Sequence, residues 1–425
     1  MHSSDQKGPF MTWPIDSPIV DVMDWTIRQE EYDDRVRRVQ ATLSDRGLDG
    51  LVLFHPIRMA YLSGFYHLST ERPMAIVVSA KQDGLGALVP WLEQEHIAKA
   101  AGVTNVRVYP EYPTGGTKHP LQHLVDLLEE LHLTTPSIRL GFDSNGYLDI
   151  NGYDGPTLAD AVGADVATVP ARDLVDRMRQ VKSPAELRLI EMSAVWGNLA
   201  HRLMQDKVAL GRNARDISHE ASTEASRAMI ASLGPSYAPL TSAFGSLPCN
   251  VNFTAGANTA FPHGLGNAAG LRRGDVLVTY AGADIGGYQS ELERTMIIGE
   301  PNDAFITHFT NMLQLQQAAF AALKVGRTLA EAETEVSALY QDMGLGDLQR
   351  HHSGHGIGLE GHESPFIDKG DETVIQEGMV FSVEPGLYVP GLAGFRHSDT
   401  VVVTATGVTR LTVYPRDLEN MTILL

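Results

Sequence analysis

Two glutamates on one short segment are the residues of this chain best placed to do chemistry. Glu291 and Glu293 lie two positions apart in the sequence SELERTMII, and side chains two apart on a strand leave the same face. The apolar residues 296–298 that follow indicate a strand that is at least half buried. Burying two carboxylates there would be costly unless a cation, a metal ion or a shared proton compensated their charge. The pattern predicts a compensated acidic site, and a solvated edge strand is the alternative.

Three histidines stand in positions that suit a site. His263 lies between Pro262 and Gly264, where an imidazole in an ordered loop can act as a general base; an ordinary surface-loop histidine is the alternative. His355 and His362 belong to the glycine-rich sequence SGHGIGLEGHESP. Because glycines allow a strand or ligand to approach the backbone closely, we expect both imidazoles to project into a pocket.

A further carboxylate and two arginines complete the set. Glu384 ends an apolar strand just before a Pro-Gly turn. An unpaired carboxylate buried in the core would shift its pKa and become neutral, so we expect the side chain of Glu384 to point into a site and not into the core. Arg396 lies in the sequence GFRHSD at the start of a strand. Arg72 lies in a polar loop after Gly64, for which simple solvation is the alternative to a function.

The first part of the chain alternates apolar runs with helical patterns. This alternation predicts an α/β domain with a mixed or parallel sheet. The predicted helices include residues 28–46 and 121–131, and the predicted strands are 51–54, 59–62, 74–79, 87–90, 106–109 and 138–142.

The second part predicts two helices, then strands, then two more helices, then strands. Such an order suggests a duplicated α+β half that packs its sheet into one curved layer. Ser183 as N-cap and Glu186 three residues later form a capping-box pattern. We therefore expect an N-terminal arm at residues 1–24, an α/β domain at 25–172, a crossing at 173–184 and a catalytic domain at 185–425. Its predicted helices are 185–204, 214–233, 305–323 and 329–343, and its strands fall within 243–253, 276–298, 374–389 and 401–411.

Composition excludes several classes of protein. The net charge of -19 argues against a nucleic-acid partner. No stretch approaches the roughly 18 apolar residues that a membrane helix needs, and a single cysteine, Cys249, excludes an internal disulfide and a cysteine zinc cage. We expect a cytoplasmic protein that acts on a small molecule without contacting a membrane.

Taken together and in this order, the motifs resemble the family of creatinase, prolidase and aminopeptidase P. The resemblance is close over about residues 180–425 and extends to the N-terminal part through RQVKSPAE and SGF…TERP. It implies a creatinase-type N-terminal α/β domain and a C-terminal α+β domain of the pita-bread fold, a duplicated half with a curved antiparallel sheet.

The resemblance also implies where metal ligands would lie. Metal-dependent members bind two ions through two aspartates eleven positions apart, the histidine of GHGxG, the glutamate before proline and a last glutamate. At these positions the chain has, in order, Tyr280, Glu291, His355, Glu384 and Ser398. Because a phenol and a serine hydroxyl are poor ligands for a divalent ion, we expect no cofactor. A single divalent metal ion held by the other three residues is the alternative.

The sequence LERT is similar to creatinase, the metal-free member. There the carboxylates at the positions of Glu293 and Glu384 embrace a guanidinium group, and the histidine at the position of His263 handles the proton. We therefore expect a metal-independent, creatinase-like hydrolase that cleaves a C–N bond of a small cationic guanidino, ureido or amide metabolite. The match is incomplete, because an apolar residue stands in creatinase where Glu291 stands here, and the ribbon with His362 is closer to prolidase.

The remaining expectations concern the pocket and the partner. Tyr280, His355, His362 and Arg396 are expected to line the substrate pocket. By resemblance to creatinase, Arg72 reaches the neighbouring pocket of a homodimer. Two alternatives stand beside the main hypothesis: a metal-dependent Xaa-Pro peptidase or related metal-using enzyme, and a non-catalytic binding protein with the pita-bread fold.

Overall fold

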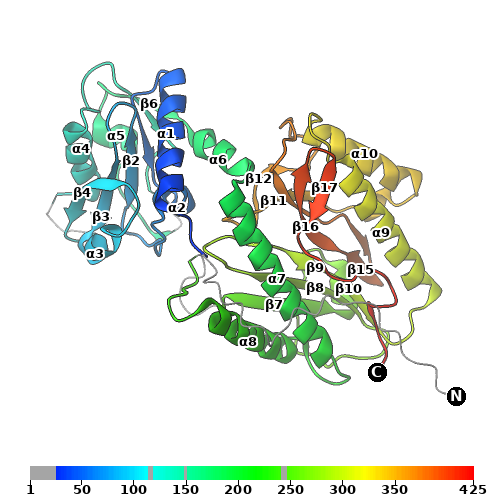
Figure 1. Cartoon of the computed structure of the whole chain (residues 1–425). Coiled ribbons are helices and arrows are strands. Elements are labelled where there is room, and N and C mark those ends of the chain that lie inside the picture. Colours follow the sequence, from blue (N-terminus) through cyan, green and yellow to red (C-terminus); the bar gives the residue numbers. More distant parts are fainter. Residues whose placement is uncertain (1–24, 113–117, 148–150, 241–246) are drawn as a thin grey trace.

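A computed structural model of the chain describes residues 25–112, 118–147, 151–240 and 247–425. The arm predicted at residues 1–24 lies outside this part. Figure 1 shows an N-terminal unit and a larger C-terminal unit side by side, with α6 (Arg172–Gln180) leading from one to the other. The division at 25–172, 173–184 and 185–425 remains a prediction.

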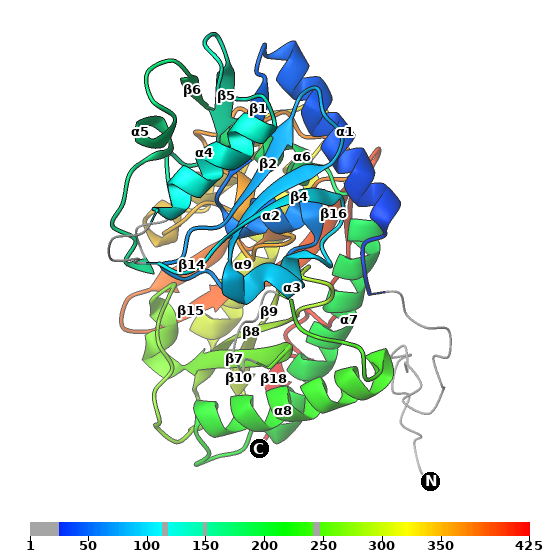
Figure 2. The same ribbon diagram turned by 90° about the vertical axis from the view of Figure 1, so that its left-hand side faces the viewer.

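The N-terminal unit contains the predicted mixed sheet. Within the described residues the strand order is β4-β3-β2-β1-β5-β6; β1–β2 and β2–β3 are antiparallel and the other pairs parallel. Helices cover the sheet, as the turned view in Figure 2 shows for α4. The elements are α1 (Gln29–Asp45), β1 (Gly50–Leu53), α2 (Pro56–Ser63), β2 (Ala75–Ser79), β3 (Leu85–Pro90), η1 (Trp91–Glu93), α3 (Gln94–Ile97), β4 (Val103–Tyr109), α4 (Pro120–Glu130), β5 (Arg139–Phe142), α5 (Leu158–Val162) and β6 (Ala167–Pro170).

The strand predicted at residues 59–62 is wrong, because these residues belong to α2. Pro56 occupies the first turn of this helix, where a missing N–H is tolerated. Gly64 ends it in the left-handed conformation, with φ 66°. A short apolar run flanked by such residues cannot be assigned to helix or strand from periodicity alone.

The crossing contains the predicted capping box. The hydroxyl of Ser183 accepts the backbone N–H of Glu186, and the Glu186 carboxylate accepts the backbone N–H of Ser183 at 2.7 Å. These two bonds begin α7 (Pro184–Lys207), the long helix that runs along the C-terminal sheet in Figure 1. The crossing therefore delivers the chain to the second sheet in a fixed direction.

The C-terminal unit is a sheet flanked by two helix pairs, as the duplicated-half prediction requires. Helix α7 contacts β7 and β8, α8 contacts β7, and α9 contacts β13 and β15. In the described residues the main sheet runs β12-β11-β13-β16-β9-β8-β10-β18, with β17 beside β16 and β7 beside β8. All of its pairs are antiparallel except β10–β18. This arrangement confirms the predicted pita-bread fold.

The helices of this unit agree closely with the predicted ranges, whereas β11, β12, β15 and β18 lie outside the predicted strand ranges. Residues 243–246 of the predicted strand 243–253 lie outside the described residues. The helices are α7, α8 (Ala214–Leu233), η3 (Gly256–Ala260), α9 (Asp303–Ala322), α10 (Leu329–Asp342) and η4 (Gly346–Leu348). The strands are β7 (Cys249–Ala255), β8 (Val276–Ala283), β9 (Leu292–Glu293), β10 (Thr295–Ile298), β11 (Gly354–Gly356), β12 (Glu363–Phe366), β13 (Val380–Val383), β14 (Gly386–Val389), β15 (Ala393–Arg396), β16 (Ser398–Thr404), β17 (Gly407–Arg410) and β18 (Thr422–Ile423). Among the described helices, none is long and apolar enough to cross a membrane.

Candidate active site

The two glutamates of the opening motif meet a third carboxylate at the centre of the main sheet. Strands β8 and β10 form the predicted hairpin, and β9 carries Glu293 at its end. One carboxylate oxygen each of Glu291, Glu293 and Glu384 lies within 4.8 Å of the others. Glu291 is 6% and Glu293 4% exposed, so the alternative of a solvated edge strand is wrong. Three buried carboxylates require compensation by positive charge or protons.

Two serine hydroxyls hold Glu291 in place. Ser398 on β16 donates a hydrogen bond of 2.8 Å to Oε1 of Glu291, and Ser382 on β13 donates to the same oxygen. The two hydroxyls are also 2.6 Å apart. Because both donors engage Oε1, the other oxygen, Oε2, can face the rest of the site.

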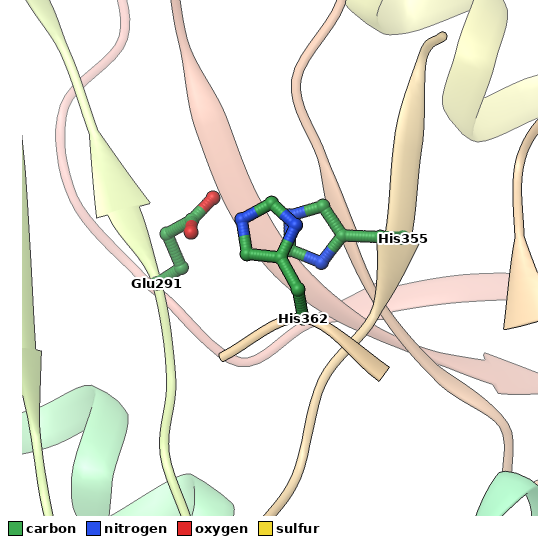
Figure 3. A group of neighbouring side chains, drawn as sticks. All are labelled: Glu291, His355 and His362. Carbon is green, nitrogen blue, oxygen red and sulfur yellow. The ribbon is translucent and has the colours of Figure 1, made fainter. Parts of the chain in front are cut away.

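The two histidines of the glycine-rich ribbon stack on one another opposite Glu291. The ring centroids of His355 and His362 are 3.7 Å apart and their planes differ by 18°. Figure 3 shows the Glu291 carboxylate pointing toward these rings from the segment that leads into β9. An imidazole nitrogen of each and a carboxylate oxygen of Glu291 lie within 4.8 Å of one another. The predicted convergence of His355 and His362 on a common site is therefore observed.

The hydrogen bonding of His355 suits a metal ligand. Its Nδ1 lies 3.0 Å from the carbonyl oxygen of Gly356, which can only accept a proton, so Nδ1 carries the hydrogen. The other nitrogen, Nε2, is buried without a hydrogen-bond partner and lies 3.3 Å from Oε1 of Glu384. Ligating histidines typically have their other ring nitrogen fixed in this way. In the described residues, the atoms that could hold one divalent ion form two overlapping clusters, Glu291 with His355 and His362, and Glu291 with Glu293 and Glu384.

The pKa values show how strongly the site favours a positive charge. Burial lowers the pKa of His355, but the carboxylates of Glu384 and Glu291 outweigh burial and raise it to about 9. Burial also raises the pKa of Glu293, and the neighbouring carboxylates of Glu291 and Glu384 raise it further. Arg396 lowers this pKa but does not outweigh them, so that it stands at about 8. The guanidinium of Arg396 alone therefore does not compensate the negative charge of the three carboxylates. A further cation in the site would complete the compensation.

Arg396 forms a two-point ion pair with Glu293. Its Nη2 donates to Oε1 of Glu293 at 2.6 Å, and its Nε lies 2.5 Å from Oε2. The same Nε is 3.5 Å from Oε2 of Glu384. Although burial raises the pKa of Glu384, Arg396 and His355 together hold it well below the usual value of a glutamate.

A cavity of about 240 Å³ opens beside this cluster. His263 lies exposed at the cavity, together with Tyr280, Glu293 and Arg396. Four of the predicted site residues thus share one pocket. The cavity is also lined by Asn252, Thr254, Thr259, Phe261, Pro262, Gly264, Val278, Thr279 and Tyr388.

Among the predicted site residues, His355, His362 and Glu384 lie in the metal-site clusters and not in the lining of this cavity, whereas Arg72 belongs to neither. It lies in the N-terminal unit, where its guanidinium pairs with Glu111 and Glu71 at 2.6 Å each. Arg72 is absent from the cavity lining. Within a single chain, the structure gives it no contact with the site.

The supporting residues Tyr388 and Ser382 were not identified from the sequence, and Ser398 was named only as a poor metal ligand. Tyr388 accepts a hydrogen bond from Nη1 of Arg396 at 3.1 Å and lies 2.8 Å from Nε2 of His351. Ser382 and Ser398 each lie two positions from a predicted site residue, so the same-face rule that joined Glu291 to Glu293 would have found them.

A second buried arginine supports the strands beneath the carboxylates. Arg294 is fully buried and pairs with Asp399 at 2.8 Å. Its guanidinium also donates to the backbone carbonyls of Glu293 and Ser398. This network fixes β9 against β16, and nothing local in the sequence indicates it.

Comparison with known proteins places this arrangement among peptidases. Residues 190–405 match the model of metallopeptidase family M24, and residues 35–181 match the creatinase/prolidase N-terminal domain. A probable dipeptidase PepE of Mycobacterium tuberculosis is 30% identical over 92% of this chain and 96% of its own length. An Xaa-Pro dipeptidase of Pyrococcus furiosus is 32% identical over 58% of this chain and 67% of its own length. The crystal structure of dipeptidase PepE from Mycobacterium ulcerans superposes with a TM-score of 0.78 at 28% identity, covering 94% of this chain and 100% of that one.

These findings overturn two of the predictions. The relatives are dipeptidases in a metallopeptidase family, so a metal-independent, creatinase-like hydrolase of a guanidino metabolite is wrong. The expectation of no cofactor is wrong for the same reason, and a candidate metal cluster is present in the described residues. Despite the losses at Tyr280 and Ser398, Glu291 shares one candidate cluster with His355 and His362 and another with Glu293 and Glu384.

Proposed function

Because the chain belongs to metallopeptidase family M24, we propose that it is a metal-dependent hydrolase that cleaves the C–N bond of a dipeptide, with Xaa-Pro dipeptides as the substrate class. The observation that carries this proposal is the unpartnered Nε2 of His355, which faces a cluster of buried carboxylates. A divalent ion would compensate such a cluster and would take the lone pair of Nε2 in place of a proton.

The size of the cavity supports a small substrate. Its volume of about 240 Å³ lies below the roughly 300–1,000 Å³ of sites for drug-sized ligands. A dipeptide suits this space better than a folded polypeptide does. Relatives that carry the name Xaa-Pro dipeptidase or dipeptidase point to the same class.

The ligands of the ion would be Glu291, His355 and Glu384, with His362 stacked against His355. When bound, a divalent ion supplies Lewis acidity that polarises the scissile carbonyl. His263, exposed at the cavity, is placed to take a proton from the attacking water and return it to the leaving nitrogen. Through their ion pair, Glu293 and Arg396 present fixed polar groups at the cavity for orienting the peptide.

A homodimer remains part of the proposal. Because Arg72 does not reach the cavity of its own chain, a role for it at a substrate carboxylate requires a second copy. Light scattering on the purified protein and kinetics of Arg72→Ala test this point. We expect a dimer and a raised KM; a monomer with wild-type kinetics in the variant would exclude the role.

A panel of peptides tests the substrate class. The metal-loaded protein is assayed with Ala-Pro, Ala-Ala and Ala-Pro-Ala, and free amino acids are separated by chromatography. We expect Ala-Pro to be cleaved with the highest kcat/KM, and His263→Ala to lower kcat by about 10²–10⁴-fold. His219→Asn, an exposed histidine on α8, is the matched control. Failure of the loaded protein to cleave any dipeptide would contradict the proposal.

A further inference from the structure

Arg396 lies between two carboxylates of the site. Its Nε is 2.5 Å from Oε2 of Glu293 and 3.5 Å from Oε2 of Glu384. Tyr388 and the carbonyl oxygen of Pro262 accept from its Nη1 at 3.1 and 3.5 Å. The guanidinium is therefore held by several partners and is part of the built site. We propose that the Glu293–Arg396 ion pair takes the place of a second metal ion, so that the centre holds a single divalent ion.

Glu384 shows how the guanidinium substitutes for an ion. Its Oε1 faces Nε2 of His355 at 3.3 Å, while its Oε2 faces Arg396. In a dinuclear centre such a carboxylate would have a metal ion on each side. In this chain it has the predicted ion position on one side and a fixed organic cation on the other.

Glu291 likewise has only one carboxylate oxygen available to a metal ion, whereas a bridging ligand needs both. One of its oxygens, Oε1, accepts the hydroxyls of Ser382 and Ser398. Those two hydrogen bonds engage an oxygen that a bridging carboxylate would need for another ion. Glu291 is then left with one oxygen, Oε2, for a metal.

The residues at two expected ligand positions cannot replace carboxylates. Burial, reinforced by the charges of Glu291 and Glu293, raises the pKa of the Tyr280 phenol, which therefore stays protonated. Ser398 supplies a hydroxyl that is already engaged with Glu291. Neutral hydroxyls are weak ligands for divalent ions at neutral pH.

Positive charge already lies beside the carboxylates. The guanidinium of Arg396 pairs with Glu293 and lies 3.5 Å from Oε2 of Glu384. A second divalent ion next to this guanidinium would bring like charges together in a buried site, which is costly.

This inference rests on the metal dependence proposed above, and a metal count separates the two. Metal-free protein is dialysed against excess Mn²⁺, washed free of loose ions and analysed for manganese per chain by mass spectrometry of the elements. We expect close to one ion per chain and the electron paramagnetic resonance spectrum of an isolated Mn²⁺. Two ions per chain with a coupled spectrum would overturn the inference and leave the proposed function standing. No bound ion would overturn both.

A variant reverses the substitution. The triple change Tyr280→Asp, Glu293→Ser and Ser398→Glu restores carboxylates at both expected ligand positions and frees Arg396 from its partner. We expect close to two ions per chain and a coupled spectrum. Tyr280→Phe is the control and should retain a single ion, and circular dichroism checks that each variant folds. A folded triple variant that still binds one ion would contradict the proposed role of the ion pair.

Discussion

The hydroxyls on Glu291 offer a quantitative test of the metal site. Ser398 is fully buried and donates to Oε1 of Glu291 at 2.8 Å, and Ser382 donates to the same atom. Removing a group that orients a metal ligand typically costs about 10–100-fold in affinity. Because one of two donors survives in Ser398→Ala, we expect a loss near the lower end, about 10-fold, which corresponds to about 1.4 kcal/mol.

Removing both donors should cost more. In the double variant Ser382→Ala, Ser398→Ala the carboxylate loses its fixed orientation, and we expect about 100-fold weaker binding. Titration calorimetry of metal-free protein with Mn²⁺ measures both changes. Ser226→Ala is the matched control, because its buried hydroxyl donates to the carbonyl of Cys249 at 2.8 Å on a helix that does not hold a metal ligand.

The outcome distinguishes the metal role from a structural one. If the serine variants lost stability but kept the wild-type affinity for Mn²⁺, the hydroxyls would serve packing alone, and Glu291 would not be a ligand. An equal loss of affinity in Ser226→Ala would likewise refute the assignment, since that residue acts only through the fold.

Three further predictions follow from named contacts. Glu363 is buried between Lys182 and Arg179, so Glu363→Gln should lower the free energy of unfolding by about 3–5 kcal/mol in urea at pH 7. Burial raises the pKa of Glu363, but Lys182 and Arg179 outweigh burial and lower the pKa overall. The stability from this ion pair is therefore present above the ordinary pKa of a glutamate and is lost as the pH falls through the pKa of Glu363 in the folded protein. In Glu363→Gln, the free energy of unfolding should accordingly decline less steeply on acidification. A hundredfold excess of Mn²⁺ over its Kd should stabilise the wild type by about 2.7 kcal/mol, seen as a rise in Tm that His355→Ala abolishes.

Local patterns predicted most of the fold. Helix α8 begins and ends at the predicted residues because apolar positions repeat regularly between Asn213 and Gly234. The hairpin and its same-face glutamates followed from strand periodicity alone. The prediction failed at α2, where an apolar run too short for periodicity was decided by a proline at its start and a glycine at its end.

The site was predicted only in part, because its chemistry depends on contacts between distant positions. The side chains of Glu291, His355 and Glu384 were named as metal ligands if an ion is present; Glu291 shares one candidate cluster with His355 and another with Glu384, and the ligand assignment stays a prediction. The pairing of Arg396 with Glu293 joins residues 103 positions apart, and no local pattern reveals it. Without that pairing, Glu293 suggested a site for a cationic substrate, whereas in the structure its positive partner comes from the chain itself.

The dependence of peptide cleavage on metal tests the central proposal most directly. Protein freed of ions with a chelator is titrated with Mn²⁺, and Ala-Pro cleavage is followed alongside the amount of bound ion. We predict no turnover in the metal-free protein and a rate that rises in proportion to bound Mn²⁺ until the site is filled. Full turnover in the presence of chelator, with no ion bound, would contradict the account.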